Sequence, residues 1–282
     1  MKQLNWAVIG CGVISENHLE PVVKSDKVRL YAVCDSNEVT AKETAEKYGC
    51  DKVYTDYREL LRDPEVDVVS ICTPSGMHGE MAIEAAKHKK HILCEKPMEI
   101  TKEKIDAMIR AAKENDVKLG CVFQRRTYPE AIAARKFVEE NDLGPIVYAE
   151  ARAKYFRSRE YYKSADWRAT WELDGGGCLM NQGVHAIDLL CWMMGDVKNV
   201  FARCETITHD IVVEDTAAAI VEFTSGALGV IQGSTNTCPS QDTKITLYFE
   251  KGTLWFGDEG IGGAFEDPNL VIPEINSFES NI

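Results

Sequence analysis

The sequence predicts a two-domain α/β protein, with a doubly wound parallel sheet first and an α+β domain with a mostly antiparallel open sheet second. Three observations carry this prediction. Short apolar runs alternate with amphipathic segments up to residue 123, strand-like segments follow one another after it, and a glycine-rich turn lies near the N-terminus. Alternating strands and helices are typical of a parallel sheet covered on both faces. We expect domains at residues 1–123 and 124–282.

In the first half, periodicity and turn residues place each element. We expect strands at residues 6–9, 29–34, 66–71, 91–94 and 118–123. We expect helices at residues 15–25, 39–48, 57–62, 79–89 and 102–115.

In the second half, one helix leads into alternating segments. We expect helices at residues 129–141 and after the triple glycine at residues 175–177. We expect strands at residues 146–156, 200–207, 216–223, 226–234, 243–249 and 253–256.

Composition excludes several classes of protein. The 282 residues carry a formal charge of −13, which argues against nucleic acid or an anionic membrane surface as the main partner. No segment approaches the ~18 apolar residues of a membrane span. The ten cysteines form no C-x-x-C pair and lie mostly in apolar runs, as is typical of free thiols in a reducing compartment. We therefore expect a cytoplasmic protein without a metal site.

The turn after the first strand indicates dinucleotide binding. Gly10 permits a tight turn, and Gly12 lets a pyrophosphate approach the backbone at a helix N-terminus. Asp35, at the end of the second strand, is placed to accept hydrogen bonds from the ribose 2′-OH, which favours NAD over NADP. The cofactor contacts that we expect here are Gly10, Gly12, Val13, Ile14, Asp35 and Ser36.

A second strand end carries Thr73, Pro74 and His78. Ligands of open α/β sheets bind at such ends, so we expect these residues near the cofactor. His78 is equally well explained as a capping or core histidine.

Two further motifs carry groups able to move protons. Three glycines run into a helix with Asn181, His185 and Asp188 at i, i+4 and i+7, so we expect these side chains on one face. The glycines leave backbone that a ligand can approach closely. The opposite, buried stripe is expected to contain Met180, Val184, Ile187, Cys191 and Met194. The other motif is Glu95-Lys96-Pro97.

Taken together, these motifs resemble the glucose-fructose oxidoreductase, inositol dehydrogenase and rhizopine catabolism family of sugar oxidoreductases. The resemblance implies that Lys96 and His185 face the nicotinamide from the two domains, with the sugar between them. It also implies that the chain crosses between domains at Gln124 and lines the cofactor pocket there. The further cofactor contacts that we expect are Glu95, Lys96, Gln124 and Arg168.

The sequence departs from the family in two places. Asn181 stands where many members carry an aspartate, and an amide cannot accept a proton. This variant is similar to members that oxidise UDP-N-acetylglucosaminuronic acid at C3. The family usually continues into a helical C-terminal segment, whereas this sequence stops at residue 282. We expect either a truncated chain or a short variant.

Oxidising a secondary alcohol requires a base within reach of the hydroxyl. We expect Lys96 to be this base, with a pKa lowered by the charged nicotinamide ring. His185 is the alternative base or a donor to the substrate, and Asn181 orients the substrate.

The leading hypothesis is an NAD-dependent dehydrogenase acting on a sugar, uronic acid or sugar-nucleotide. Residues 150–168 carry a net charge of +3, six basic against three acidic residues, among aromatic side chains. This segment is either a solvated strand face or a site for an anionic substrate. The alternative functions are an NAD-retaining glycosidase and a non-catalytic NAD-binding regulator. We also expect a homo-oligomer, a dimer or tetramer, because an open sheet leaves one face exposed.

Overall fold

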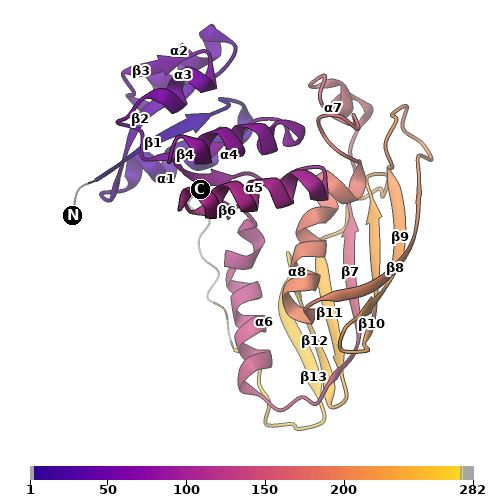
Figure 1. Ribbon diagram of the computed structural model, residues 1–282. Coiled ribbons are helices and arrows are strands. Elements are labelled where there is room, and N and C mark those ends of the chain that lie inside the picture. Colours follow the sequence, from indigo (N-terminus) through magenta and orange to yellow (C-terminus); the bar gives the residue numbers. More distant parts are fainter. Residues whose placement is uncertain (1–2, 274, 276–282) are drawn as a thin grey trace. The chain divides into compact units, whose positions relative to one another are not determined.

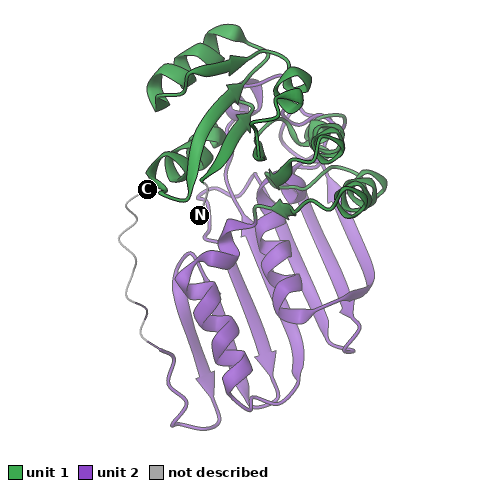
Figure 2. Cartoon of the chain, turned by 60° about the vertical axis from the view of Figure 1, so that its left-hand side comes forward, with its two compact units in different colours: residues 1–122, 172–175 green, residues 123–171, 176–282 purple. Residues whose placement is uncertain are grey.

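The computed structural model describes residues 3–273 and 275, and the chain divides into two compact units (Figure 2). Unit 1 comprises Met1–Val122 and Glu172–Gly175, and unit 2 comprises Phe123–Trp171 and Gly176–Ile282. Among the described residues we find no helix with the length and apolar character needed to span a bilayer. All ten cysteines fall within this part of the chain and are free thiols, as predicted. The chain end, on which the expectation of truncation rests, lies outside the described residues.

Unit 1 is a doubly wound α/β unit, as the sequence predicts. Its six strands are all parallel and follow the order β3-β2-β1-β4-β5-β6. The order reverses between β1 and β4, the topological switch point at which ligands of such sheets bind. The strands are β1 (Leu4–Ile9), β2 (Val28–Cys34), β3 (Lys52–Tyr54), β4 (Val68–Ile71), β5 (His91–Cys94) and β6 (Leu119–Cys121). The helices are η1 (Val13–Ser15), α1 (Glu16–Lys24), α2 (Glu38–Tyr48), α3 (Tyr57–Arg62), η2 (Ser75–Met77), α4 (His78–Lys87) and α5 (Lys102–Asn115).

Several helices of unit 1 begin where the sequence supplies a capping side chain. Asn37, Asp56 and Thr101 accept hydrogen bonds from backbone N–H groups in the first turns of α2, α3 and α5. These caps explain why the predicted helix bounds are close to the observed ones. β3 is not predicted from the sequence, because a three-residue strand is too short to show periodicity.

Unit 2 contains a seven-stranded sheet in the order β13-β12-β11-β7-β10-β9-β8. Every neighbouring pair is antiparallel except β7 and β10, so the predicted mostly antiparallel sheet is confirmed. The strands are β7 (Ile146–Lys154), β8 (Val197–Glu205), β9 (Thr216–Phe223), β10 (Leu228–Ser234), β11 (Lys244–Phe249), β12 (Gly252–Gly257) and β13 (Gly260–Phe265). The helices are η3 (Gln124–Thr127), α6 (Pro129–Glu140), α7 (Arg159–Lys163), the π-helical turn η4 (Cys178–Gly183) and α8 (Val184–Met194). α7 and β13 are not predicted from the sequence.

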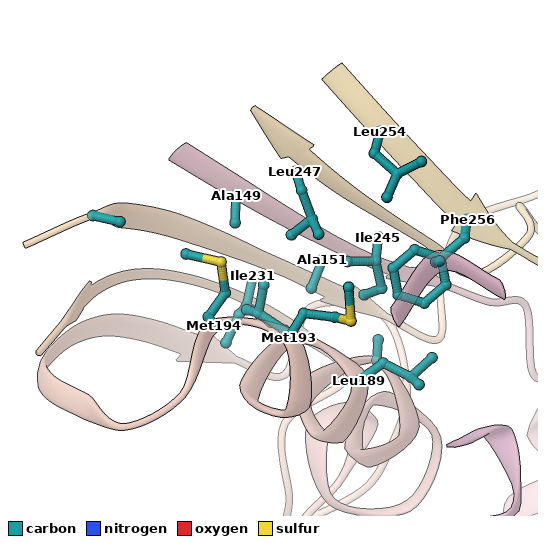
Figure 3. Packing of buried hydrophobic residues seen from close by; sticks show 14 of the residues in the cluster. Ala149, Ala151, Leu189, Met193, Met194, Ile231, Ile245, Leu247, Leu254 and Phe256 are labelled. Carbon is teal, nitrogen blue, oxygen red and sulfur yellow. The ribbon is translucent and has the colours of Figure 1, made fainter. Parts of the chain in front are cut away.

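The core of unit 2 lies between its sheet and the helices α6 and α8, which run along one face of that sheet (Figure 1). Leu189, Met193 and Met194 of α8 point toward the sheet (Figure 3). Ala149 and Ala151 of β7 are buried there, and their small side chains let α8 lie close to the strand.

The predicted buried stripe of this helix is largely wrong. Met194 is buried, but the other four residues of the predicted stripe are only half-buried. The residues that α8 buries are Ala186, Leu189, Leu190, Met193 and Met194. Residues 178–183 form a π-helical turn. A stripe counted from Met180 with regular α-helical spacing therefore falls on the wrong residues of α8.

Candidate active site

The glycine-rich turn of unit 1 joins β1 to η1 and α1. Gly10 has a φ of +90°, and a Cβ atom there would lie 2.7 Å from the carbonyl oxygen of Cys72, so a side chain is excluded. A Cβ atom on Gly12 would meet nothing within 4 Å, and Val13 beside it is exposed. The space next to Gly12 therefore lets a bound group approach the backbone, as a pyrophosphate requires.

Asp35 follows β2 and is held against this turn. Its Oδ2 accepts a hydrogen bond of 2.9 Å from the Cys11 N–H, and its Oδ1 accepts one of 2.8 Å from the Asn37 N–H. Each carboxylate oxygen has a further lone pair, which is the acceptor that a ribose hydroxyl requires. The ribose contact stays a prediction, as do the contacts of Ile14 and Ser36.

His78 lies at the start of α4 and is buried. Its Nε2 is 2.9 Å from the Thr73 carbonyl oxygen, and its Nδ1 is 2.9 Å from the Pro97 carbonyl oxygen. Burial lowers the pKa of His78, although both carbonyl groups favour the protonated ring. The imidazole thus joins the turn after β4 to the segment after β5. Of the two explanations that the sequence allows, these contacts favour the structural one, and a cofactor contact stays a prediction.

Glu95 and Lys96 follow β5. Glu95 is 4% exposed, and its Oε2 accepts a hydrogen bond of 3.0 Å from the Lys96 N–H. Its Oε1 lies 3.0 Å from Nε2 of the buried His18. Sequence reasoning missed His18, because its partner is 77 residues away and α1 otherwise reads as an ordinary amphipathic helix.

Gln124 begins η3 in unit 2, and its Oε1 is buried without a hydrogen-bond partner among the described residues. A buried acceptor that lacks a donor is costly, so this position favours a ligand that supplies an N–H or O–H group. The carboxamide of a nicotinamide carries such donors. The open backbone at Gly12 fits NAD, and a contact of Gln124 with the nicotinamide stays a prediction.

The triple glycine is explained by packing within the protein. Gly175 belongs to unit 1 and has a φ of +78°, and a Cβ atom there would lie 2.3 Å from Cγ2 of Ile100. A Cβ atom on Gly177, in unit 2, would lie 1.8 Å from the Glu214 carbonyl oxygen. Where we predicted backbone open to a ligand, we find protein atoms in the space that a side chain would fill.

The helical segment that follows carries Asn181 in η4 and His185 in the first turn of α8, so the two residues lie on one continuous segment. The carboxylate of Glu214 accepts hydrogen bonds from the Gly177 N–H at 2.8 Å and the Leu179 N–H at 3.0 Å. Glu214 thereby holds the start of the turn that carries Asn181. π-Helical turns occur frequently at functional sites.

Asp188 forms a bidentate ion pair with Arg126 of η3. Nε of Arg126 donates to Oδ2 at 2.7 Å and Nη2 donates to Oδ1 at 2.5 Å. The pair ties α8 to the segment that begins at Gln124. In this position Asp188 supports the helix that presents His185.

Arg168 lies after α7 and is held by aromatic side chains. Its guanidinium carbon is 4.4 Å from the ring centroid of Tyr161 and 4.7 Å from that of Trp167. The Tyr161 hydroxyl accepts hydrogen bonds from Nη1 of Arg168 at 2.7 Å and from Nε2 of Gln182 at 2.8 Å. Because Gln182 follows Asn181, this tyrosine connects a cationic group to the π-helical turn. A cofactor contact of Arg168 stays a prediction.

The predicted site residues fall into two groups, one on each unit. Unit 1 carries Gly10, Gly12, Val13, Ile14, Asp35, Ser36, Thr73, Pro74, His78, Glu95 and Lys96. Unit 2 carries Gln124, Arg168, Asn181 and His185. Sequence reasoning missed two carboxylates of unit 2, Glu214 and Asp215. Asp215 is buried and accepts hydrogen bonds from the N–H groups of residues 207–209, at 3.0 Å each.

The chain is similar to several proteins that are named as dehydrogenases. The myo-inositol 2-dehydrogenase of Thermotoga maritima is 32% identical over 255 residues, which cover 88% of this chain and 73% of that protein. The levoglucosan dehydrogenase of Pseudarthrobacter phenanthrenivorans is 27% identical over 273 residues, which cover 84% of this chain and 68% of that protein. The crystal structure of the WlbA dehydrogenase from Bordetella pertussis, in complex with NADH and UDP-GlcNAcA, matches with a TM-score of 0.90 at 32% identity. That match covers 95% of this chain and 83% of the other.

Two family models together match most of the chain. The model of the oxidoreductase family with an NAD-binding Rossmann fold matches residues 4–123. The model of the GFO/IDH/MocA C-terminal domain matches residues 131–255. The resemblance inferred from the motifs is thereby confirmed, and NAD is the cofactor of this fold. The chain belongs to the GFO/IDH/MocA family of oxidoreductases.

Proposed function

We propose that this chain is an NAD-dependent dehydrogenase that oxidises a secondary hydroxyl of a nucleotide-linked uronic acid. One observation carries the choice of substrate. The hydroxyl of Tyr161 joins the guanidinium of Arg168 to Gln182, which lies in the same turn as Asn181. A fixed cation beside the turn favours an anionic sugar over a neutral polyol. The likeness to WlbA, whose structure holds UDP-GlcNAcA, supports the same class.

The roles of the site residues follow from their chemistry. NAD, held by the glycine-rich turn and Asp35, would supply the hydride acceptor. Lys96 takes the proton of the substrate hydroxyl on Nζ. His185 donates a hydrogen bond to the substrate, and Asn181 orients it through its amide, which can donate and accept but cannot act as a base.

We assign cofactor binding to residues 1–123, and substrate binding and self-association to residues 124–282. The backbone at Gly12 and the carboxylate of Asp35 support the first assignment. The cluster around Tyr161 supports the second. The expected cytoplasmic location is part of the same proposal.

We further propose that the open face of the sheet in unit 2 binds a second copy of this chain. Phe201 and Ile220 are paired neighbours on β8 and β9 and are 75% and 53% exposed. Leu228 of β10 is 48% exposed on the same face. Contiguous apolar side chains of this kind are typical of protein–protein interfaces, and most soluble homo-oligomers are symmetric. Phe201→Asp should halve the mass measured by light scattering; an unchanged mass would rule this face out.

The test of the substrate is NADH formation with UDP-GlcNAcA, with UDP-GlcNAc, which lacks the sugar carboxylate, and with free glucuronic acid, myo-inositol and levoglucosan. We expect the highest kcat/KM with UDP-GlcNAcA. Arg168→Gln should raise the KM for the anionic substrate about tenfold or more, because a charged hydrogen bond contributes ~1.5–3 kcal/mol. Arg159→Gln, at an exposed arginine of α7, is the matched control and should leave the KM unchanged.

Two results would overturn the proposal. Sugar release without NADH would indicate a glycosidase that retains NAD, and NAD binding without turnover of any substrate would indicate a regulator. Faster oxidation of myo-inositol than of UDP-GlcNAcA would support the dehydrogenase activity but reject the anionic substrate.

A further inference from the structure

A buried chain of hydrogen bonds runs through unit 1 and ends at the backbone of Lys96. The indole Nε1 of Trp6 donates to Oγ of Ser70 at 2.9 Å, and that Oγ lies 2.9 Å from Nδ1 of His18. Nε2 of His18 is 3.0 Å from Oε1 of Glu95, and Oε2 of Glu95 accepts the Lys96 N–H at 3.0 Å. Ser70, Glu95 and His18 are 0%, 4% and 7% exposed. This chain of hydrogen bonds thus connects β1, β4, α1 and the end of β5 inside the protein.

The donors and acceptors give this chain a direction. An indole N–H can only donate, so Ser70 accepts from Trp6 and keeps its own hydroxyl proton for Nδ1 of His18. A ring nitrogen without a proton would turn its lone pair toward the Glu95 carboxylate. Nε2 of His18 therefore carries a proton and donates it to Glu95, and every member of the chain has a partner in this arrangement.

Burial favours the neutral form of three titratable side chains near Glu95. Burial raises the pKa of the Cys72 and Cys94 thiols and lowers the pKa of the His78 imidazole. A buried carboxylate is costly unless it is paired or hydrogen-bonded. His18 is accordingly the side chain that holds Oε1 of Glu95, while the other oxygen holds the peptide of Lys96.

We propose that His18 is a positioning residue for Lys96. It fixes the Glu95 carboxylate, and the carboxylate fixes the backbone from which the Lys96 side chain extends. This inference rests on the proposed function, in which Lys96 is the base. A displacement of about 1 Å at a reacting group can cost about a hundredfold in rate, so a group that acts only through a backbone hydrogen bond can still control turnover.

The test compares two substitutions of His18 in the NAD-bound enzyme. His18→Leu keeps the bulk and removes both hydrogen bonds, and we expect it to lower kcat about 10- to 100-fold, with smaller changes in the KM values. His18→Gln restores a donor toward Glu95 and an acceptor toward Ser70, so we expect kcat within about threefold of the wild type. A merely structural role would make both variants lose activity in proportion to their loss of thermal stability.

A double-mutant cycle with Glu95→Gln tests whether His18 acts on Lys96 through Glu95. If His18 acts through Glu95, then His18→Leu lowers kcat by less than about twofold in the Glu95→Gln background. If the two losses multiply instead, the inference is wrong. Should His18→Leu fail to fold, Ser70→Ala removes only the next hydroxyl along the chain and must still lower kcat; an unchanged kcat would also reject the inference.

Lys96→Ala in the same assay separates this inference from the proposed function. If Lys96→Ala keeps full activity, the base is assigned wrongly. If Lys96→Ala is inactive while His18→Leu keeps the wild-type kcat, Lys96 remains the base and only the positioning role of His18 is rejected.

Discussion

The two units hold their polar groups in different ways. In unit 1, Asp35 and Glu95 each come directly after a parallel strand, so the topology of one sheet gathers them at its carboxyl edge. In unit 2, Asn181 lies in a π-helical turn and Arg168 in a loop after α7. The supports there are two carboxylates, Glu214 and Asp215, that accept backbone N–H groups of the π-helical turn and of the loop at residues 207–209. In unit 1 the polar groups are positioned by the sheet, and in unit 2, the proposed substrate half, they are positioned by individual long-range contacts.

The largest effect should come from the proposed base in the cofactor half. We expect Lys96→Ala to lower kcat by about 10²- to 10⁴-fold, because it removes the group that accepts the hydroxyl proton. Binding of NAD, measured by fluorescence titration, should change little. Lys102→Ala removes an exposed lysine at the start of α5 and is the control. A wild-type kcat in Lys96→Ala would show that Lys96 is not the base.

Glycine-to-alanine changes in the two halves should have opposite consequences. Gly177→Ala places a Cβ atom on the Glu214 carbonyl oxygen, and we expect a loss of about 3 kcal/mol or more in the free energy of unfolding. Gly12→Ala meets open space, so its stability should stay within about 0.5 kcal/mol of the wild type while NAD affinity falls. Chemical unfolding and NAD titration measure both. Equal stability losses would contradict the contrast between a packing glycine and a cofactor glycine.

The same contrast explains what the sequence can predict. Gly10, Asp35 and Lys96 stand next to strand signals that are visible over a few residues, so the fold of unit 1 and its candidate site follow from local patterns. In unit 2 the mostly antiparallel character of the sheet follows from alternation, but its strand order and the turn at residues 178–183 do not. The carboxylate of Glu214, some 35 residues further along the chain, holds this π-helical turn, so no local pattern near Asn181 predicts it.

His18 is a similar case within unit 1. Its partners Ser70 and Glu95 come from β4 and from the end of β5, so its role exists only once the sheet has formed. Capping residues such as Asn37 act over two or three residues and could be predicted. Distance along the chain, rather than the unit in which a residue lies, thus limits the prediction.

The carboxylate support in unit 2 should have a measurable pH dependence. Burial alone would raise the pKa of Asp215, but hydrogen bonds from Asn236 and from the N–H groups of residues 207–209 outweigh it and hold the pKa below its usual range. The ionised form is favoured in the fold, so its stabilisation is present above the unfolded value of about 3.9 and is lost as the pH falls through the folded value. We expect Asp215→Asn to lower the free energy of unfolding by about 2 kcal/mol at neutral pH, and by less below about pH 4.

The control for Asp215→Asn is Asp210→Asn, which removes an equal charge from an exposed position in the same loop. Thermal unfolding at several pH values distinguishes the two. A loss of stability that is equal in both variants would mean that net charge, and not the hydrogen bonds to residues 207–209, stabilises this loop.

The smallest effect should appear at the ribose contact. Asp35→Ala removes the acceptor that is held against the glycine-rich turn, and we expect NAD affinity to fall about tenfold, since a charged hydrogen bond contributes ~1.5 kcal/mol or more. The variant should also discriminate less against NADP, because the carboxylate no longer repels a 2′-phosphate. Glu38→Ala, at an exposed carboxylate three residues further along, removes the same charge and should leave both affinities unchanged. If the two variants lower the affinity for NAD equally, unit 1 attracts the cofactor through its surface charge and not through a contact between Asp35 and the ribose. The positioning of polar groups by the sheet would then not explain how the adenosine part of NAD is bound.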